Sequence, residues 1–105
     1  MENVVKTIGG ALGRKGTLYR WGGDEFAISL PDFSTDEALS TAERVRRAIE
    51  EAKAGGNIPV TASVGVCDTD RLQDSQAETL LESADKAMYA SKKNGKNRVT
   101  SWPIE

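Results

Sequence analysis

A glycine pair between two strand-like segments is the feature that most constrains how this chain folds. Residues 17–21 are rich in β-branched and aromatic side chains, and residues 26–30 alternate in the period of a strand. Gly22, Gly23 and Asp24 stand between them. Glycine adopts positive φ at little cost, so such a pair closes a tight turn between antiparallel strands. The sequence therefore predicts a β-hairpin over residues 17–30.

Apolar residues at helical spacing predict three helices around this hairpin. The first covers residues 4–12, the second lies between Ser34 and Gly55, and the third lies between Ser75 and Gly95. Ser34 and Ser75 are each followed three residues later by glutamate, which is the pattern of a capping box.

Alternating β-branched and small residues predict a strand at residues 60–67, and we interpret residues 98–102 as a final edge strand. The order is α-β-β-α-β-α-β, which indicates a two-layer α+β fold. The last two strands and the helix between them have the order of a parallel crossover unit.

Composition limits the class of protein. The 105 residues are enough for one domain, and 38% hydrophobic with 29% charged residues argue against disorder. No apolar run is long enough to span a bilayer, and the N-terminus has no signal-peptide core, so we expect a cytoplasmic protein without membrane contact. A net charge of −2 gives no general attraction for nucleic acid.

The chain has no histidine, which restricts its chemistry. Histidine-based zinc sites and Ser-His or Cys-His catalysis are excluded, so any catalytic acid, base or metal ligand of this chain is a carboxylate. Basic residues gather late in the chain, where a local patch suits a small anionic ligand better than a duplex. They are Lys86, Lys92, Lys93, Lys96 and Arg98.

Asp24 and Glu25 follow the glycine pair and supply hard oxygen ligands of the kind that Mg²⁺ prefers. Neighbouring residues of a strand point to opposite faces, so these two side chains do not simply chelate one ion together. A two-metal phosphoryl-transfer site needs at least one more carboxylate facing the turn. The alternative for this segment taken alone is an ordinary solvated turn.

Four segments together resemble the GGDEF domain, the diguanylate cyclase family. Residues 22–26 spell the GGDEF signature, with Arg20 two positions before it. Residues 60–66 resemble the family's "vTxSxGva" strand, residues 84–92 its "ADxAlYxaK" helix, and residues 95–99 its "GrNrv" ending. The motifs occur in the family's order over nearly the whole chain. We interpret residues 1–105 as the C-terminal two-thirds of such a domain.

The resemblance implies a ferredoxin-like, nucleotidyl-cyclase-like fold and the condensation of two GTP molecules into cyclic di-GMP. Two domains would face each other about a two-fold axis, with Mg²⁺ or Mn²⁺ as cofactor. Asp24 would coordinate metal and help activate the attacking hydroxyl, and Glu25 would assist with metal or substrate. Gly22 and Gly23 would let the nucleotide lie against the turn.

The resemblance also implies that Lys92 and Lys96 contact phosphate. Lys96 stands where the family more often has arginine, so the charge is kept but the bidentate fork is lost. The alternative for both residues is an ordinary helix C-terminus with solvated lysines. Many members carry an inhibitory Arg-x-x-Asp site before the signature. Gly13 and Gly16 occupy those positions here, so we expect no feedback inhibition through it.

The family's first strand carries a metal-binding aspartate and lies N-terminal to every segment matched here. That strand is central in the family's sheet, between the hairpin and the strand at residues 60–67. We therefore expect the chain either to close its sheet by rearranging or to borrow a strand from a partner. Two functions stay open: an enzyme acting as a homodimer under an upstream sensory domain, or a non-catalytic nucleotide-binding or regulatory module.

Overall fold

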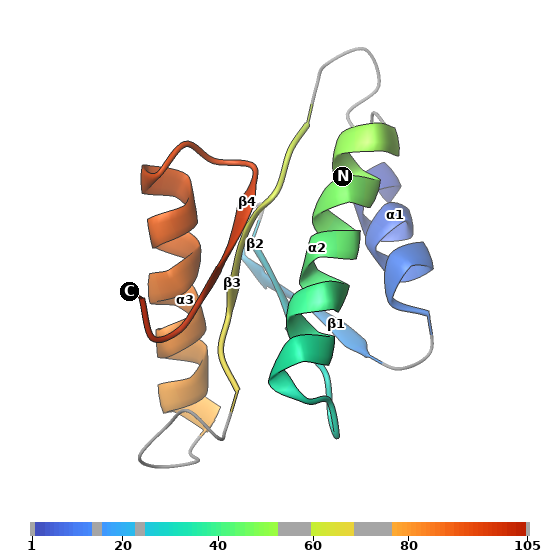
Figure 1. Cartoon of the computed structure of the whole chain (residues 1–105). Coiled ribbons are helices and arrows are strands. Elements are labelled where there is room, and N and C mark those ends of the chain that lie inside the picture. Colours follow the sequence, from blue (N-terminus) through green and yellow to red (C-terminus); the bar gives the residue numbers. More distant parts are fainter. Residues whose placement is uncertain (1, 14–15, 23–24, 53–59, 69–76, 105) are drawn as a thin grey trace.

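The computed structural model describes residues 2–13, 16–22, 25–52, 60–68 and 77–104 (Figure 1). Its elements follow the predicted order α-β-β-α-β-α-β. They are α1 (Glu2–Leu12), β1 (Thr17–Gly22), β2 (Glu25–Ser29), α2 (Thr35–Ala52), β3 (Ser63–Val66), α3 (Ala77–Lys93) and β4 (Arg98–Ser101).

Both predicted strand pairings are confirmed. β1 and β2 run antiparallel, from the pair Thr17 and Ser29 to the pair Gly22 and Glu25, with an irregularity near Arg20. β3 and β4 run parallel and are connected by α3, which makes the expected crossover unit. In Figure 1 the β3–β4 pair lies between α3 and α2, and both helices contact both strands.

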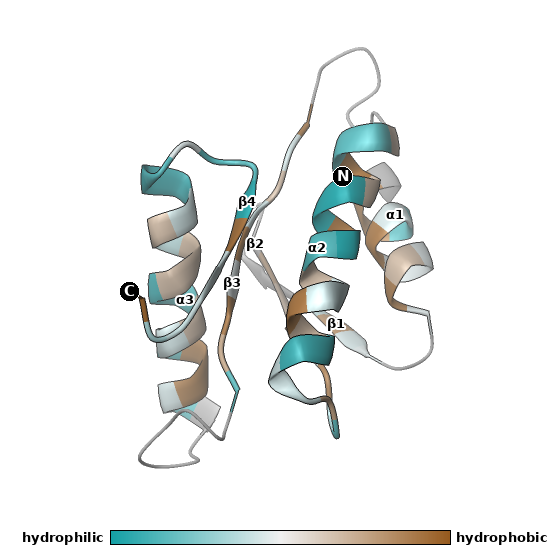
Figure 2. Cartoon of the chain, in the orientation of Figure 1, coloured by the Kyte–Doolittle hydropathy of each residue, from teal (hydrophilic) through white to brown (hydrophobic). Residues whose placement is uncertain are grey.

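The largest buried cluster lies between α1 and α2. Ile8 and Leu12 of α1 meet Val45 and Ile49 of α2, and each of these side chains is buried. Figure 2 shows hydrophilic and hydrophobic residues alternating around α2, as expected of a helix with one buried face. No helix in the described part of the chain is both long and apolar enough to cross a membrane.

The hairpin and the segment before β3 pack against this same cluster. The side chains that do so from outside the helices are partly buried; they are Leu18, Phe26, Ile28, Leu30, Val60 and Ala62. The strand predicted at residues 60–67 is shorter than expected, because the ladder begins at Ser63, which pairs with Arg98, the first residue of β4. Val60 and Ala62 precede the ladder and pack on the helical core.

β3 lies unusually close to α3. A Cβ on Gly65 would lie 2.1 Å from the carbonyl oxygen of Ala84 and 2.2 Å from the backbone nitrogen of Met88. Ala87 and Ser91 on the facing side of α3 are completely buried, at 0% exposure. Small residues on both elements thus allow the backbone of β3 to contact the backbone of α3.

The predicted capping box at the start of α2 is confirmed. The backbone N–H of Glu37 donates to Ser34 Oγ at 3.1 Å, and the backbone N–H of Ser34 donates to Glu37 Oε1 at 3.1 Å. These bonds satisfy N–H groups that have no partner within the helix. Ser75, which we expected to cap α3, lies outside the described residues.

Among the described residues the strands form two separate two-stranded sheets, β1–β2 and β3–β4. No ladder of described residues joins β2 to β3, so the sheet is not closed by pairing these strands. This result removes the simplest form of the rearrangement that we expected. Borrowing a strand from a partner stays a prediction.

Replacing Gly65 tests the close contact between β3 and α3. Gly65→Ala should lower the free energy of unfolding by about 1–3 kcal/mol or more, because the new methyl group meets backbone atoms that cannot rotate away. Gly10→Ala is the matched control, since a Cβ there has nothing within 4 Å and the helix favours alanine. This control should gain about 0.5–1 kcal/mol. Urea denaturation measures both, and a neutral Gly65→Ala would contradict the packing.

The mass of the protein in solution tests whether the chain borrows a strand from a second copy. The edges of the two separate sheets carry backbone groups suited to pairing with another chain. We predict that light scattering after size exclusion gives twice the mass of one chain. A well-folded monomer with a slow-exchanging, fully paired sheet would rule out the exchange.

Candidate functional site

The hairpin turn brings two of the predicted site residues opposite each other. Gly22 ends β1, Glu25 begins β2, and the two are paired across the ladder. Only two residues connect this pair, which is the length of the tightest hairpins. Gly23 and Asp24, predicted to line the nucleotide and to bind metal, lie outside the described residues.

Packing on the helical core holds the hairpin in place. Leu18 and Ile28 form a cross-strand pair, and both side chains pack against the cluster between α1 and α2. Phe26, directly after Glu25, packs there too. Tyr19, on the alternate position of β1, is exposed. The turn therefore extends from a hairpin that has one face fixed to the core.

The other two predicted residues lie at the C-terminal end of α3 and in the turn that follows it. Lys92 lies in the last turn of α3, and Lys96 lies in the turn that follows. The backbone N–H of Lys96 donates to the carbonyl of Ser91 at 2.9 Å, which closes the helix end. Two lysines thus sit at the negative end of a helix dipole, where a cation is favoured before any ligand binds.

Ser91 anchors this end of α3 to both strands. Its hydroxyl donates to the carbonyl of Val64 at 2.8 Å and lies 2.6 Å from the hydroxyl of Thr100. The side chain is fully buried, so these bonds compensate for removing the hydroxyl from water. The position of the lysine-bearing turn is thereby set by β3 and β4.

A polar network connects the same turn to α2. Arg46 Nη1 donates to Asn97 Oδ1 at 2.8 Å, and Arg46 Nε donates to the carboxylate oxygens of Glu43 at 3.0 and 3.1 Å. Asn97 Nδ2 donates to Glu50 Oε2. The hydrogen bond from Arg46 holds the pKa of Glu43 below its usual range, and the same bond raises the pKa of Arg46.

Sequence reasoning missed this network. Asn97 belongs to a recognised motif but received no role, and Arg46 was not singled out. The spacing of Glu43, Arg46 and Glu50 along α2 is a readable signal, because residues three and four apart share a helix face. The bond to Asn97 joins residues 51 positions apart, and no local pattern indicates it.

Within the described ranges there is no group of three or more cysteine, aspartate and glutamate residues placed to hold a metal ion. Asp24, the predicted metal ligand, lies outside the described residues, so a metal site at the hairpin turn stays a prediction.

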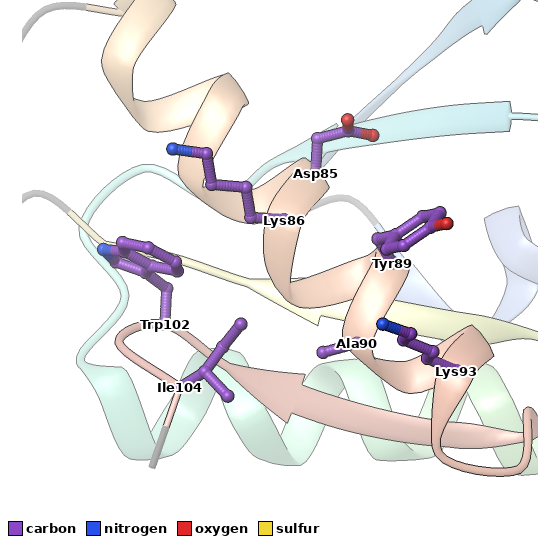
Figure 3. A pocket seen from close by; sticks show the side chains of 7 residues that line it. All are labelled: Asp85, Lys86, Tyr89, Ala90, Lys93, Trp102 and Ile104. Atoms are coloured by element: carbon purple, nitrogen blue, oxygen red, sulfur yellow. The ribbon is translucent and has the colours of Figure 1, made fainter.

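A separate hollow of about 420 Å³ lies between α3 and the C-terminal residues Trp102 and Ile104 (Figure 3). Its lining residues are Asp85, Lys86, Tyr89, Ala90, Lys93, Trp102 and Ile104. The ammonium group of Lys86 lies 5.6 Å from the centre of a Trp102 ring, a cation–π distance. None of the predicted site residues lines this hollow.

Known proteins match the sequence of this chain over most of its length. The family described as "Diguanylate cyclase, GGDEF domain" matches residues 1–98. Diguanylate cyclase A of Treponema denticola is 41% identical over 103 residues, which cover 95% of this chain and 28% of that protein. Diguanylate cyclase DosC of Escherichia coli is 39% identical over 89 residues, covering 81% of this chain and 19% of that protein.

Solved structures share the fold. The GGDEF domain of DgcB from Caulobacter crescentus, determined in complex with c-di-GMP, superposes with a TM-score of 0.79 at 28% identity, covering 94% of this chain and 60% of that chain. The active GGEEF domain of a diguanylate cyclase from Vibrio cholerae gives a TM-score of 0.82 at 24% identity, covering 97% and 65%.

Proposed function

Because this chain belongs to the GGDEF family, we propose that it acts in a diguanylate cyclase. The reaction condenses two GTP molecules into cyclic di-GMP and releases two pyrophosphates. In this proposal residues 1–105 are the C-terminal two-thirds of one GGDEF domain. The observation that carries it is the intact signature at residues 22–26, at the turn of a hairpin whose flanking residues Gly22 and Glu25 are paired.

In the proposed site the hairpin turn binds the reacting end of the nucleotide. Gly22 and Gly23 lack a Cβ, so the backbone offers room for a phosphate. Asp24 holds the metal and helps to activate the 3′-hydroxyl that attacks the α-phosphate, and Glu25 assists with metal or substrate. Mg²⁺ or Mn²⁺ would neutralise phosphate charge there.

Lys92 and Lys96 bind the phosphates at the other side of the proposed site. Lys92 lies in the last turn of α3, which Ser91 fixes to β3 and β4, and Lys96 lies in the turn that follows. Lysine acts on a phosphate as a point charge, so Lys96 contributes electrostatic attraction rather than the two-pronged hydrogen bonding of an arginine. That attraction suits the leaving pyrophosphate, whose charge grows during the reaction.

The partners follow from the chemistry. Each GTP is attacked by the hydroxyl of the other, so two copies would face each other as a homodimer, with strand exchange as the means of completing the sheet. The chain spans 28% and 19% of the two relatives above, which leaves room in such proteins for an upstream sensory domain. We place the proposed activity in the cytoplasm, where GTP is available.

A non-catalytic nucleotide-binding or regulatory module is the second candidate. It is favoured because the signature itself supplies only two carboxylates at the turn, Asp24 and Glu25. A two-metal reaction needs a further carboxylate beside the turn. Under this alternative GTP binds to the turn and the lysines, and no product forms.

Product formation from GTP and Mg²⁺ separates the two candidates. We expect cyclic di-GMP by chromatography, and Asp24→Ala should lower its rate at least about 100-fold because metal binding is lost. Asp85→Ala is the control, since this exposed carboxylate on α3 lies outside the proposed site. Equal turnover by wild type and Asp24→Ala would contradict the proposed role. GTP binding without product would favour the non-catalytic module.

A further inference from the structure

The turn that carries Lys96 has a backbone that needs support. Gly95, Lys96 and Asn97 have φ values of 122°, 63° and 46°, so three successive residues lie at positive φ. Glycine tolerates this region and asparagine enters it readily, but lysine does so rarely. A turn of this kind keeps one shape only when surrounding contacts hold it.

Two sets of contacts hold it. On one side, Arg98 Nε donates to the carbonyl of Lys96 at 3.1 Å. A Cβ on Gly95 would lie 2.6 Å from Arg98 Nη2, so glycine leaves the space for this guanidinium. On the other side, Asn97 is held by α2 through the bonds from Arg46 and to Glu50.

We propose that Arg46, acting through Asn97, is a positioning residue that fixes the Lys96 turn for a phosphate group. This inference rests on the proposed function and extends its site to the C-terminal half of α2. Both polar atoms of the Asn97 amide are occupied by α2, so Asn97 acts on the turn and not on the ligand.

The side chain of Arg46 is itself largely buried and held by hydrogen bonds. It is 13% exposed, and its fork is shared between Glu43 and Asn97. Neighbouring Arg47 is 67% exposed and pairs only with Glu43 among the described residues, at 3.5 Å. Two arginines of equal charge on one helix thus differ in whether they reach the turn.

A turn that is fixed before the ligand arrives loses less conformational entropy on binding, which raises its affinity for phosphate. Lys96 is exposed, and no hydrogen bond or ion pair joins its ammonium group to another residue in the described part of the chain. If the turn beneath it were mobile, a binding phosphate would have to order both the backbone and the side chain. With Asn97 held by Arg46, the ligand orders only the side chain.

The test uses inorganic tripolyphosphate, which has the phosphate charges of GTP without its base. Isothermal titration at several salt concentrations compares Arg46→Ala with its charge-matched control Arg47→Ala. We expect Arg46→Ala to weaken binding about three- to tenfold. Arg47→Ala should change it less than about twofold, because a distant exposed charge is largely screened. Equal effects of the two substitutions, or no effect of either, would overturn the inference.

A second variant keeps the test valid if Arg46→Ala is unstable. Asn97→Gly removes the amide while tolerating positive φ. It should weaken binding without changing the salt dependence, because no charge is lost, whereas Lys96→Gln should lower the salt dependence. Unchanged affinity in Asn97→Gly would overturn the proposal.

GTP turnover by the same wild-type sample separates this inference from the proposed function. Failure of the wild type to bind tripolyphosphate would overturn the positioning role, even if GTP were converted. Tripolyphosphate binding that depends on Arg46, in a sample without turnover, would support the positioning role and count against the cyclase.

Discussion

The close contact of β3 with α3 at Gly65 is the constraint on which the rest of this structure depends. Because Gly65 has no side chain, the strand reaches the helix backbone, and the buried Ser91 can bond to both Val64 and Thr100. These bonds fix the C-terminal end of α3 relative to the parallel pair β3–β4. The turn with Lys96 begins at that end. A larger residue at position 65 would push the helix away and move the lysines with it.

α2 connects this unit to the hairpin. Its buried face packs with α1, and the hairpin rests on the same cluster. Its polar residues reach the other unit at two points: Thr35 Oγ1 donates to Asp68 just after β3, and Arg46 donates to Asn97 just before β4. A single helix therefore sets the relation between the hairpin that carries the signature and the turn that carries Lys96.

Features that depend on neighbouring residues could be predicted from the sequence. The hairpin follows from the glycine pair between two strand patterns, and the Ser34–Glu37 cap follows from a spacing of three residues. The parallel pairing of β3 and β4 follows from the helix between them. The candidate site residues were proposed from the motifs that contain them, and their roles stay predictions; the structure places Lys92 in the last turn of α3.

Features that depend on tertiary packing could not be predicted. Val60 has the sequence pattern of a strand residue, but the ladder starts at Ser63, opposite the first residue of its parallel partner β4. In the sequence Gly65 was only one letter of a motif. Its role is evident only in the structure, where the backbone of α3 leaves no room for a Cβ at this position. No sequence pattern indicates that Arg46 contacts Asn97, because 51 positions separate them.

The central claim is that the hairpin turn and the Lys96 turn serve one nucleotide. Paramagnetic broadening by Mn²⁺ tests it directly on the isotopically labelled protein. With Mn²⁺ alone, we predict broadening of backbone amide signals near the hairpin turn only. With Mn²⁺ and GTP together, signals of Gly95, Lys96 and Asn97 should broaden as well, because the phosphates bring the metal and the lysines to one ligand. Broadening confined to the hairpin in the presence of saturating GTP would contradict the account.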